Sequence, residues 1–373
     1  MKHVLTINGG SSSLRYALFE LQRNPVRLIG GKLERLAGSA AKAVDAMLDK
    51  ISAEAAYVKP DAIGHRIVHG MQHSAPERIG AKLLKQLRQN VLYDPEHLPR
   101  EIEFIGAMQR RFKKIPQVAC FDTAFHRTMP RVATLLPIPR RYATRGVQRY
   151  GFHGLSFTFL MQELERLGDG AARSGRVILA HLGSGASLAA VRDGRCIDTS
   201  MGFTPTAGLV MGTRTGDVDP GLMSYLAMKR RLSPKGLLAM VNHQSGLLGV
   251  SGTSADVRDL LEREARDPRA CDALDLFCYQ AKKWIGSFAA ALGGIDTLVF
   301  AGGVGENAAP VRRRICEGLE FLGLQLDAVA NTQGATVIST KPSRVRVRII
   351  RTDEEVVIAQ QTARLLGFTD SGE

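Results

Sequence analysis

The sequence VLTINGGSSSL, residues 4–14, returns in modified form as ILAHLGSGASL, residues 178–188. Each copy consists of an apolar run, a short Gly/Ser turn and a second apolar run, which is the pattern of two strands joined by a tight turn. The second copy leads into Asp193-Gly194, a dipeptide typical of a two-residue hairpin turn. Two such copies predict a duplicated domain, although two glycine turns can also resemble each other by chance.

Short β-type runs alternate with helical stretches along the rest of the chain, which predicts an α/β fold. Strands are expected at residues 4–7, 14–19, 62–68, 117–122, 177–182, 297–300 and 345–350. Helices are expected at residues 40–50, 101–112, 155–167, 272–291, from about 310, and at 354–366. A glycine turn is expected between the strand at 297–300 and the helix from about 310. No low-complexity linker divides the chain, so the domain boundary has to come from the repeat.

Length and composition fit a globular protein of two domains, with 373 residues, 45% of them hydrophobic and 23% charged. The most apolar stretch, residues 284–305, contains Asp296 and two glycine pairs, so we expect no membrane span. The opening MKHVLTI lacks the features of a signal peptide, which favours a cytoplasmic location. Five cysteines without a CxxC pair indicate neither a zinc site nor a disulfide framework.

The formal net charge is +14, from 50 basic and 36 acidic side chains. Such a charge fits nucleic-acid binding, an anionic small substrate or simply an arginine-rich surface. The basic clusters are scattered, and no nucleic-acid motif accompanies them. We therefore interpret them as solvated surface and expect no nucleic-acid partner.

Three glycine-rich turns are candidate anion sites. Residues 8–15, NGGSSSLR, and residues 181–187, HLGSGAS, offer backbone N–H groups and hydroxyls, although Gly/Ser hairpin turns are also common without a ligand. Two anion-binding turns on separate domains suit a chain of phosphates held in a cleft. Residues 302–308, GGVGENA, fit the loose dinucleotide pattern GxGxxA, but they lie near the end of the chain with only Asp327 as a passable acidic partner. A NAD-dependent dehydrogenase is therefore disfavoured.

Four side chains stand in unusual surroundings. Arg66 and Asp122 come at the ends of expected strands, Arg214 lies inside a glycine-rich loop, and His153 lies in the aromatic-glycine turn YGFHG. Each alone also fits a capping or core role. Arginine is the preferred bidentate partner of carboxylate and phosphate, so together they describe a site for two anions without a reactive nucleophile.

Longer motifs cover nearly the whole chain in a fixed order: INGGSSSLR, GHRIVHG, FDTAFHRTMP, YGFHG, HLGSGAS, DTSMGFTPTAGLVMGTRTGDVDPG, SGTSADVRDL, GGVGEN and RTDEE. In this order they resemble the acetate/propionate kinase family, within the sugar kinase, Hsp70 and actin superfamily. The resemblance implies an α/β fold of two duplicated, ribonuclease H-like domains with a nucleotide cleft between them. The implied boundaries are residues 1–122 plus 356–373 for the N-terminal domain, which carries the first phosphate loop and the acyl-substrate side, and 123–355 for the nucleotide-binding domain.

The activity that the resemblance implies is reversible, Mg²⁺-dependent phosphoryl transfer from ATP to acetate, giving acetyl phosphate and ADP. Mn²⁺ is an alternative metal, and the family resemblance also implies a homodimer. Two other readings stay open: a kinase for propionate, butyrate or another short carboxylic acid, and a nucleotide-binding homologue without catalysis. We expect a small carboxylate and ATP as binding partners, and no membrane.

Residue roles carry over at the matching positions. The implied catalytic residues are Arg66, Asp122, His153 and Arg214, and we expect Asp122 to orient other groups because a carboxylate substrate needs no general base. The implied acyl pocket contains Arg66, Val68, Phe152 and Pro205. The implied metal ligands are Asn8 and Glu354. The implied nucleotide contacts are Arg15, His181, Leu182, Gly183, Ser184, Gly185, Asp256, Val257, Arg258, Gly303, Val304, Gly305, Glu306 and Asn307.

Five positions depart from the family pattern. Arg15 replaces a lysine, Ser184 an asparagine, Phe157 a histidine, Met71 a glycine, and Glu96 an apolar pocket residue. For Glu96 we expect an outward orientation or a pair with a base such as Arg100, since an unpaired buried carboxylate is costly. The alternative is that Glu96 points inward and selects a substrate with a donor group.

Overall fold

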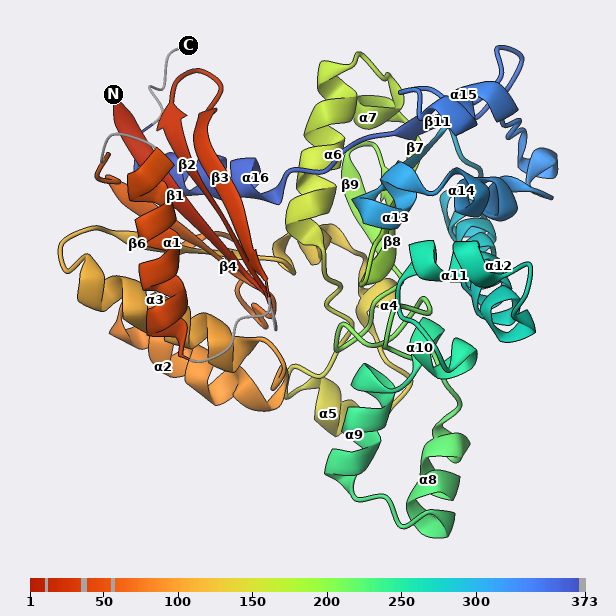
Figure 1. The fold of residues 1–373 in the computed structure, drawn as a ribbon, viewed down its shortest axis with the longest axis horizontal. Helices are drawn as coiled ribbons and strands as arrows, with labels where there is room; N and C mark the ends of the chain where they lie inside the picture. The colour runs from red at the N-terminus through yellow and green to blue at the C-terminus, as the bar shows by residue number, and fades with distance from the viewer. Residues whose placement is uncertain (11–12, 35–38, 55–57, 369–373) are drawn as a thin grey trace. The chain divides into compact units, whose positions relative to one another are not determined.

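The computed structural model describes residues 1–10, 13–34, 39–54 and 58–368 (Figure 1). The chain divides into two compact units. The first unit contains Met1–Arg127, Phe152–Phe159 and Asp353–Glu373. The second unit contains Thr128–Gly151 and Leu160–Thr352. Each unit is built around one sheet.

The sheet of the first unit has the strand order β3-β2-β1-β4-β6-β5. The three strands β1, β2 and β3 form an antiparallel meander, and β4 and β6 continue the sheet parallel to β1. The strands are β1 Lys2–Gly9, β2 Ser13–Leu21, β3 Val26–Glu34, β4 Ala62–Ile67, β5 Glu77–Arg78 and β6 Gln117–Phe121. The other elements are α1 Ala40–Glu54, α2 Ala81–Gln89, η1 Asn90–Leu92, α3 Leu98–Arg111, η2 Ala124–Thr128 and α16 Glu354–Leu365.

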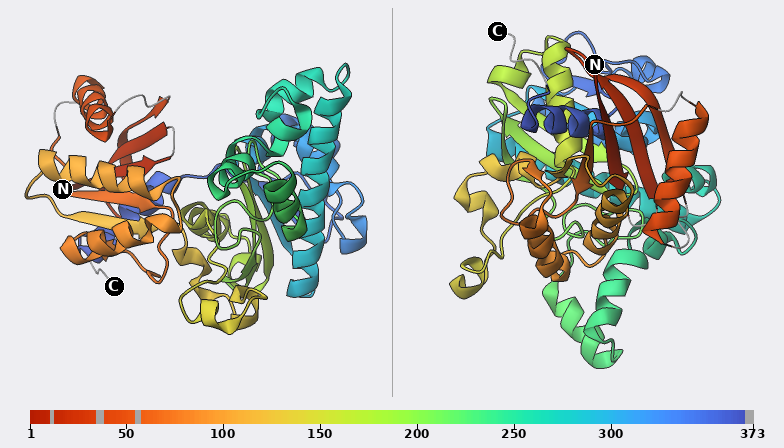
Figure 2. Two further views of the ribbon diagram at one scale, coloured as in Figure 1. Left: turned by 90° about the horizontal axis from the view of Figure 1, so that it is seen from below. Right: turned by 90° about the vertical axis from the view of Figure 1, so that its left-hand side faces the viewer.

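Helices cover both faces of this sheet, as Figure 2 shows for α1 and α3 on one face and α16 on the other. Because side chains alternate along a strand, Leu5 and Ile7 point to the α1 and α3 side, where Phe104 belongs to the same core cluster. Val4 points to the opposite side, where its cluster includes Ala359 of α16. The carboxyl ends of β1, β4 and β6 are therefore held between two apolar layers.

The sheet of the second unit has the strand order β11-β10-β7-β8-β9. Its strands are β7 Arg176–Leu182, β8 Ala186–Arg192, β9 Arg195–Thr199, β10 Thr297–Ala301 and β11 Arg346–Ile349. Here β7, β8 and β9 form an antiparallel meander, while β10 and β11 run parallel to β7. The order β9-β8-β7-β10-β11 thus repeats β3-β2-β1-β4-β6, strand for strand and direction for direction. The duplicated α/β fold predicted from the glycine turns is confirmed.

The remaining helices are α4 Arg131–Thr134, α5 Arg140–Ala143, α6 Gly154–Arg166, α7 Ala171–Ser174, α8 Pro220–Lys229, α9 Pro234–His243, α10 Gly246–Ser251, α11 Val257–Arg263, α12 Pro268–Leu292, α13 Gly302–Asn307, α14 Ala309–Cys316, η3 Glu320–Leu322 and α15 Ala328–Gln333. The long helix α12 begins at its cap Asp267, which accepts a hydrogen bond from the N–H of Arg269, and ends at Gly293 with φ 72°. The Asp193-Gly194 turn has φ of 50° and 74°, as a type I′ hairpin requires.

The strands and helices expected from the sequence are confirmed, with ends that differ by a few residues. The prediction of a glycine turn after residue 300 was wrong in its conformation, because residues 302–307 form the short helix α13. No disulfide joins the five cysteines, all of which lie in the described ranges. Among the helices of the described residues, none combines the length and apolar character needed to cross a bilayer.

Candidate active site

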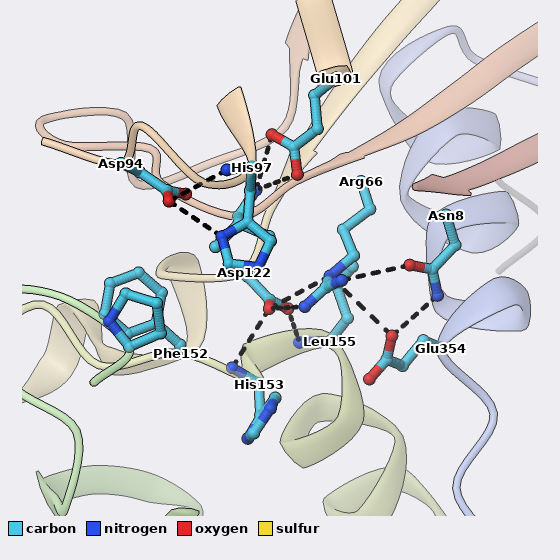
Figure 3. A network of polar contacts seen from close by, with 12 residues as sticks. Asn8, Arg66, Asp94, His97, Glu101, Asp122, Phe152, His153, Leu155 and Glu354 are labelled. Atoms are coloured by element: carbon cyan, nitrogen blue, oxygen red, sulfur yellow. Dashed lines mark hydrogen bonds and ion pairs between the residues drawn. The ribbon is translucent and has the colours of Figure 1, made fainter. Parts of the chain in front are cut away.

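A buried ion pair joins the ends of β4 and β6 (Figure 3). Arg66 lies on β4 opposite Cys120 of β6, and Asp122 follows β6 directly, with its N–H donating to the carbonyl of Ile67 at 2.9 Å. The guanidinium of Arg66 donates to Oδ2 of Asp122 from Nη2 at 2.7 Å and from Nε at 3.2 Å. Asp122 is fully buried and the Arg66 side chain is 15% exposed. The adjacent parallel strands β4 and β6 therefore place a cation, Arg66, beside its counter-ion, Asp122.

Arg66 has two further partners in the same unit. Its Nη1 donates to Oδ1 of Asn8 at 3.4 Å, and its Nε lies 4.0 Å from Oε2 of Glu354. Burial alone opposes the charge of Arg66, but the attraction of Asp122 and Glu354 outweighs it and raises the pKa of the guanidinium. Arg66 is therefore a permanent cation with a fixed orientation.

Two adjacent carboxylates face Asn8. The amide Nδ2 of Asn8, at the end of β1, donates to Glu354 at 2.8 Å and to Glu355 at 2.9 Å, and both glutamates belong to the first turn of α16. All three residues are at most 8% exposed. Burial, and then repulsion by Glu354, raises the pKa of Glu355. Oxygen donors that repel one another in a buried setting suit a hard divalent cation such as Mg²⁺.

Such a cation would take only part of its ligands from the protein. Within the described ranges no group of three or more His, Cys, Asp or Glu side chains has a metal-binding arrangement. Mg²⁺ is usually held by one or two carboxylates together with waters and substrate phosphates, so the small donor set fits it. Glu355 was absent from the sequence-based ligand set, although the Glu-Glu doublet of RTDEE was a visible signal.

Asp122 also fixes the turn that carries His153. Its Oδ2 accepts from the backbone N–H of His153 at 3.2 Å, and its Oδ1 accepts from that of Leu155 at 3.3 Å. His153 has φ 60°, a left-handed conformation that few residues other than glycine adopt. At Gly154 a Cβ atom would lie 2.0 Å from the carbonyl oxygen of Asp122, so only glycine permits this approach. One carboxylate thus positions the Arg66 guanidinium and the His153 backbone.

Besides Arg66, the expected acyl-pocket residues of this unit are both buried. Val68 is 2% exposed and Phe152 is 1% exposed, and the ring of Phe152 packs edge-on against His69 at 5.2 Å. Behind Val68 lies Glu101 of α3, whose two oxygens accept from the Val68 N–H at 3.1 and 3.2 Å. Burial, and then repulsion by Asp94, raises the pKa of Glu101 well above its usual value.

Glu101 is a residue that the sequence analysis missed. It occupies an inward position of α3 that Leu98, Ile105 and Met108 share at helical spacing, and all four are buried. A carboxylate in an otherwise apolar stripe was the available signal. Glu96, on which the sequence analysis concentrated, is half-buried, and its outward orientation stays a prediction.

Three positions of this unit that depart from the family pattern have the following surroundings. Arg15 is exposed on β2 opposite Asn8. Its positive charge favours the ionised form of Glu355, but burial has the larger effect and the pKa of Glu355 is raised overall. Phe157 is fully buried, with its ring 5.7 Å from that of Phe125 and 5.8 Å from that of His126. Met71 has φ 50°, a conformation that favours glycine. Ser11 and Ser12 of the first glycine turn lie outside the described residues.

In the second unit, Arg214 and Pro205 lie together. The Nη1 of Arg214 donates to the carbonyl of Pro205 at 2.8 Å. The loop is tied to the start of α10, where the N–H groups of Ser245 and Leu247 donate to the carbonyls of Thr213 and Met211 at 3.0 and 2.8 Å. The arginine is therefore held in place by its own loop and by the start of α10.

Gly212 joins this loop to two of the expected nucleotide stretches. Its N–H donates to the carbonyl of Ser184 at 3.1 Å. A Cβ atom at Gly212 would lie 3.1 Å from the carbonyl oxygen of Ala255 and 3.4 Å from that of Ser184. Gly212 is therefore the point where three segments meet: residues 181–185, the Arg214 loop and Ala255, which precedes Asp256. Asp256 itself caps α11 and pairs with Arg258 at 2.6 Å.

The third stretch, α13, lies against the end of β7. Gly302 has φ 76°, and a Cβ atom there would lie 2.6 Å from the carbonyl oxygen of Leu182. The side chain of Glu306 turns back to accept from the N–H groups of Gly302 at 3.0 Å and Thr352 at 3.2 Å. The structure thus gathers the predicted residues into two sets, one in each unit. The first contains Asn8, Arg66, Asp122, His153 and Glu354, and the second contains residues 181–185 and 303–307 with Arg214.

Comparison with known proteins gives one consistent result. The sequence model described as the Acetokinase family matches residues 30–360. The acetate kinase of Rhodopseudomonas palustris is 40% identical over 391 residues, covering 97% of this chain and 98% of that protein. The acetate kinase of Methylocella silvestris is 42% identical over 398 residues, again covering 97% of this chain and 98% of the relative.

Solved structures agree with the sequence matches. The acetate kinase of Porphyromonas gingivalis superimposes with a TM-score of 0.88 at 35% identity, covering 98% of this chain and 100% of that structure. A propionate kinase of Francisella tularensis superimposes with the same TM-score of 0.88 at 36% identity and the same coverage.

Proposed function

Because the chain belongs to the acetokinase family, we propose that it catalyses the reversible transfer of the γ-phosphoryl group of ATP to acetate, giving acetyl phosphate and ADP. The observation that carries this proposal is the buried Arg66–Asp122 pair, which holds a permanent cation in a fixed orientation. Acetate is already an anion at pH 7, so the reaction requires positioning and charge neutralisation and no general base.

Arg66 binds the substrate carboxylate in this proposal, with Val68, Phe152 and Pro205 lining the acyl pocket. His153 and Arg214 stabilise the equatorial oxygens of the transferred phosphoryl group, where charge develops in the transition state. Asp122 orients Arg66 and the His153 turn. Its oxygens already accept four hydrogen bonds from these groups and Leu155, which supports an orienting role over that of a base.

Mg²⁺, with Mn²⁺ as the alternative, is the metal that we assign to Asn8 and Glu354, and we add Glu355, whose carboxylate contacts the Asn8 amide beside that of Glu354. A metal held there would supply positive charge that neutralises the phosphates. The nucleotide is assigned to Arg15, residues 181–185, residues 256–258 and residues 303–307. The meeting of Ser184, Gly212 and Ala255 supports a common role for residues 181–185 and 256–258, and the approach of Gly302 to the Leu182 carbonyl adds residues 303–307.

We propose that residues 1–122 with 356–373 form the domain that carries the first phosphate loop and the acyl-substrate side, and that residues 123–355 form the nucleotide-binding domain. We also propose that the protein works in the cytoplasm as a homodimer. A second candidate activity is propionate kinase, which the Francisella tularensis structure favours at the same TM-score of 0.88.

The test is a coupled assay of ADP formation with acetate, propionate and butyrate, combined with hydroxamate detection of the acyl phosphate. We expect turnover with acetate and a strict need for Mg²⁺ or Mn²⁺. Arg66→Ala should lose activity, whereas the control Arg173→Ala, whose side chain is 78% exposed, should not. If kcat/KM is higher for propionate than for acetate, propionate is the natural substrate. If no acyl phosphate forms with any of the three acids, the proposal is overturned.

A further inference from the structure

Arg312 of α14 is buried without a counter-ion. It is 1% exposed, and burial lowers the pKa of its guanidinium, although arginine stays charged at any physiological pH. In the part of the chain that the structure describes, no carboxylate oxygen pairs with it. Burying an unpaired charge is costly, so a position of this kind needs a reason beyond packing.

Four hydrogen bonds hold the guanidinium, all to neutral oxygens. Nε donates to Oδ1 of Asn331 at 2.8 Å and Nη2 donates to the Asn331 carbonyl at 2.7 Å. Nη1 donates to the carbonyls of Gly305 at 2.9 Å and Glu306 at 3.0 Å. Two of the four acceptors therefore belong to the last turn of α13, the glycine-rich helix that contains the residues assigned to the nucleotide.

The side chain of Glu306 holds the other end of α13, at Gly302. That carboxylate accepts from the N–H groups of Gly302 and Thr352 and makes no contact with Arg312 in the described structure. Asn307 closes the loop by donating from Nδ2 to the carbonyl of Gly303 at 2.9 Å. The backbone of α13 is thus fixed from both ends, and the charge on its Gly305 and Glu306 carbonyls is the positive charge of Arg312.

We propose that Arg312 is a positioning residue for the nucleotide, whose uncompensated charge beneath the Gly302–Asn307 loop favours binding of the nucleotide phosphates. This inference rests on the proposed function, because that function assigns the loop to ATP. A buried charge is weakly screened by solvent, so it acts on a neighbouring anion more strongly than a surface arginine does. The field of Arg312 lowers the energy of bound ATP and ADP and has little effect on acetate.

The sharpest test neutralises the charge without removing the arginine. Asn331→Asp keeps an acceptor for Nε of Arg312 and turns the contact into an ion pair. Its matched control is Asn331→Leu, because both variants lose the hydrogen bond from Nδ2 to the Ala309 carbonyl, which is 3.0 Å long. Arg313→Ala, which removes an exposed cation from the same helix, is the second control.

The measurements are KM for ATP and acetate, together with the affinity for ADP from thermal shift. We expect Asn331→Asp to raise KM for ATP and Kd for ADP about tenfold, with KM for acetate within about twofold. Asn331→Leu should change nucleotide binding less, and Arg313→Ala should leave it unchanged. Equal effects of Asn331→Asp and Asn331→Leu, or no effect of Asn331→Asp, would overturn the inference.

A second pair of variants covers the case in which Asn331→Asp does not fold. Arg312→Lys and Arg312→Met both lose the four-bond geometry, and only the lysine keeps the charge. We expect ADP to bind the lysine variant more tightly than the methionine variant, and equal affinities would contradict us. If the parent protein binds ADP but phosphorylates no carboxylic acid, the proposed function fails while ADP affinity still decides the role of Arg312. If it binds no ADP, both proposals fail.

Discussion

Arg66 and Asp122 come from neighbouring parallel strands, and Nη2 of the arginine lies 2.7 Å from Oδ2 of the carboxylate. The same Oδ2 accepts from the N–H of His153. Removing the negative charge of Asp122 therefore acts on two site residues at once, and this makes the carboxylate the most informative position in the first unit.

Asp122→Asn is expected to lower the free energy of unfolding by about 3 kcal/mol, because a buried pair loses one partner. The kcat should fall at least about tenfold, since Arg66 loses the carboxylate that orients it. The acidic limb of the pH–rate profile should remain. Urea unfolding and a pH–rate profile check both parts, and loss of the acidic limb would identify Asp122 as a base. The control is Asp61→Asn, whose exposed pair with Lys2 should contribute less than about 1 kcal/mol.

Arg214→Ala should lower kcat by about two to four orders of magnitude, in line with roughly 3–5 kcal/mol for a charge that acts on the transition state in a water-excluded site. The KM for ATP should change little. Steady-state kinetics with both substrates measures this. A variant whose kcat stays within threefold of the parent would show that Arg214 only supports its loop through the Pro205 carbonyl.

Glu101→Gln should make the protein more stable than the parent by an amount that grows with pH. The folded-state pKa of Glu101 is raised well above its usual 4.5, first by burial and then by Asp94. The unfolded chain therefore releases this proton above about pH 4.5 while the native state keeps it, so the parent loses stability as pH rises from 4.5 towards the folded pKa. Glutamine keeps an acceptor for the Val68 N–H and carries no such cost.

Urea unfolding of Glu101→Gln and the parent between pH 5 and 8 checks this prediction. Glu103→Gln on the same helix, with a side chain 57% exposed, is the control and should show no such trend. A stability difference that does not change with pH would mean that Glu101 titrates alike in both states.

Glu355→Gln should raise the Mg²⁺ concentration for half-maximal activity about tenfold, as the loss of a supporting carboxylate usually does. The physical reason is that Asn8 contacts Glu354 and Glu355 together, so both charges act on one small volume. Mg²⁺ titrations of the variant and the parent, with Glu103→Gln again as the control, measure the shift. An unchanged Mg²⁺ requirement would remove Glu355 from the metal site.

The topology was predictable because the repeat carries its own signals. One Gly/Ser turn marks the antiparallel half of each sheet, and an Asp-Gly hairpin adds to it in the second. Apolar runs ending at residues 68 and 122 mark the parallel half of the first. The strand β3 was missed because its side chains are mostly exposed and Gly30 and Gly31 interrupt it. An edge strand with one solvated face gives a weak apolar pattern.

The site was predictable only in part, since a sequence shows which residues are chemically suited and not which partners they find. Glu101 and Arg312 are ionisable side chains on buried helix faces, and their roles depend on carbonyl and N–H groups that neither spacing nor composition reveals. The helical form of residues 302–307 was hidden for a similar reason. It depends on Glu306 folding back to the N–H of Gly302.

The packing of α16 against β1 and β4 sets an order of events during protein synthesis. The second unit is built from residues 128–151 and 160–352, so all of its strands have been made by the time residue 352 leaves the ribosome. The first sheet begins with residue 2, yet one of its apolar faces, which Leu155 covers in part, lacks α16 until the end of the chain has been translated. The unit that starts first is thus finished last, and for most of translation Val4 lacks its native partner Ala359.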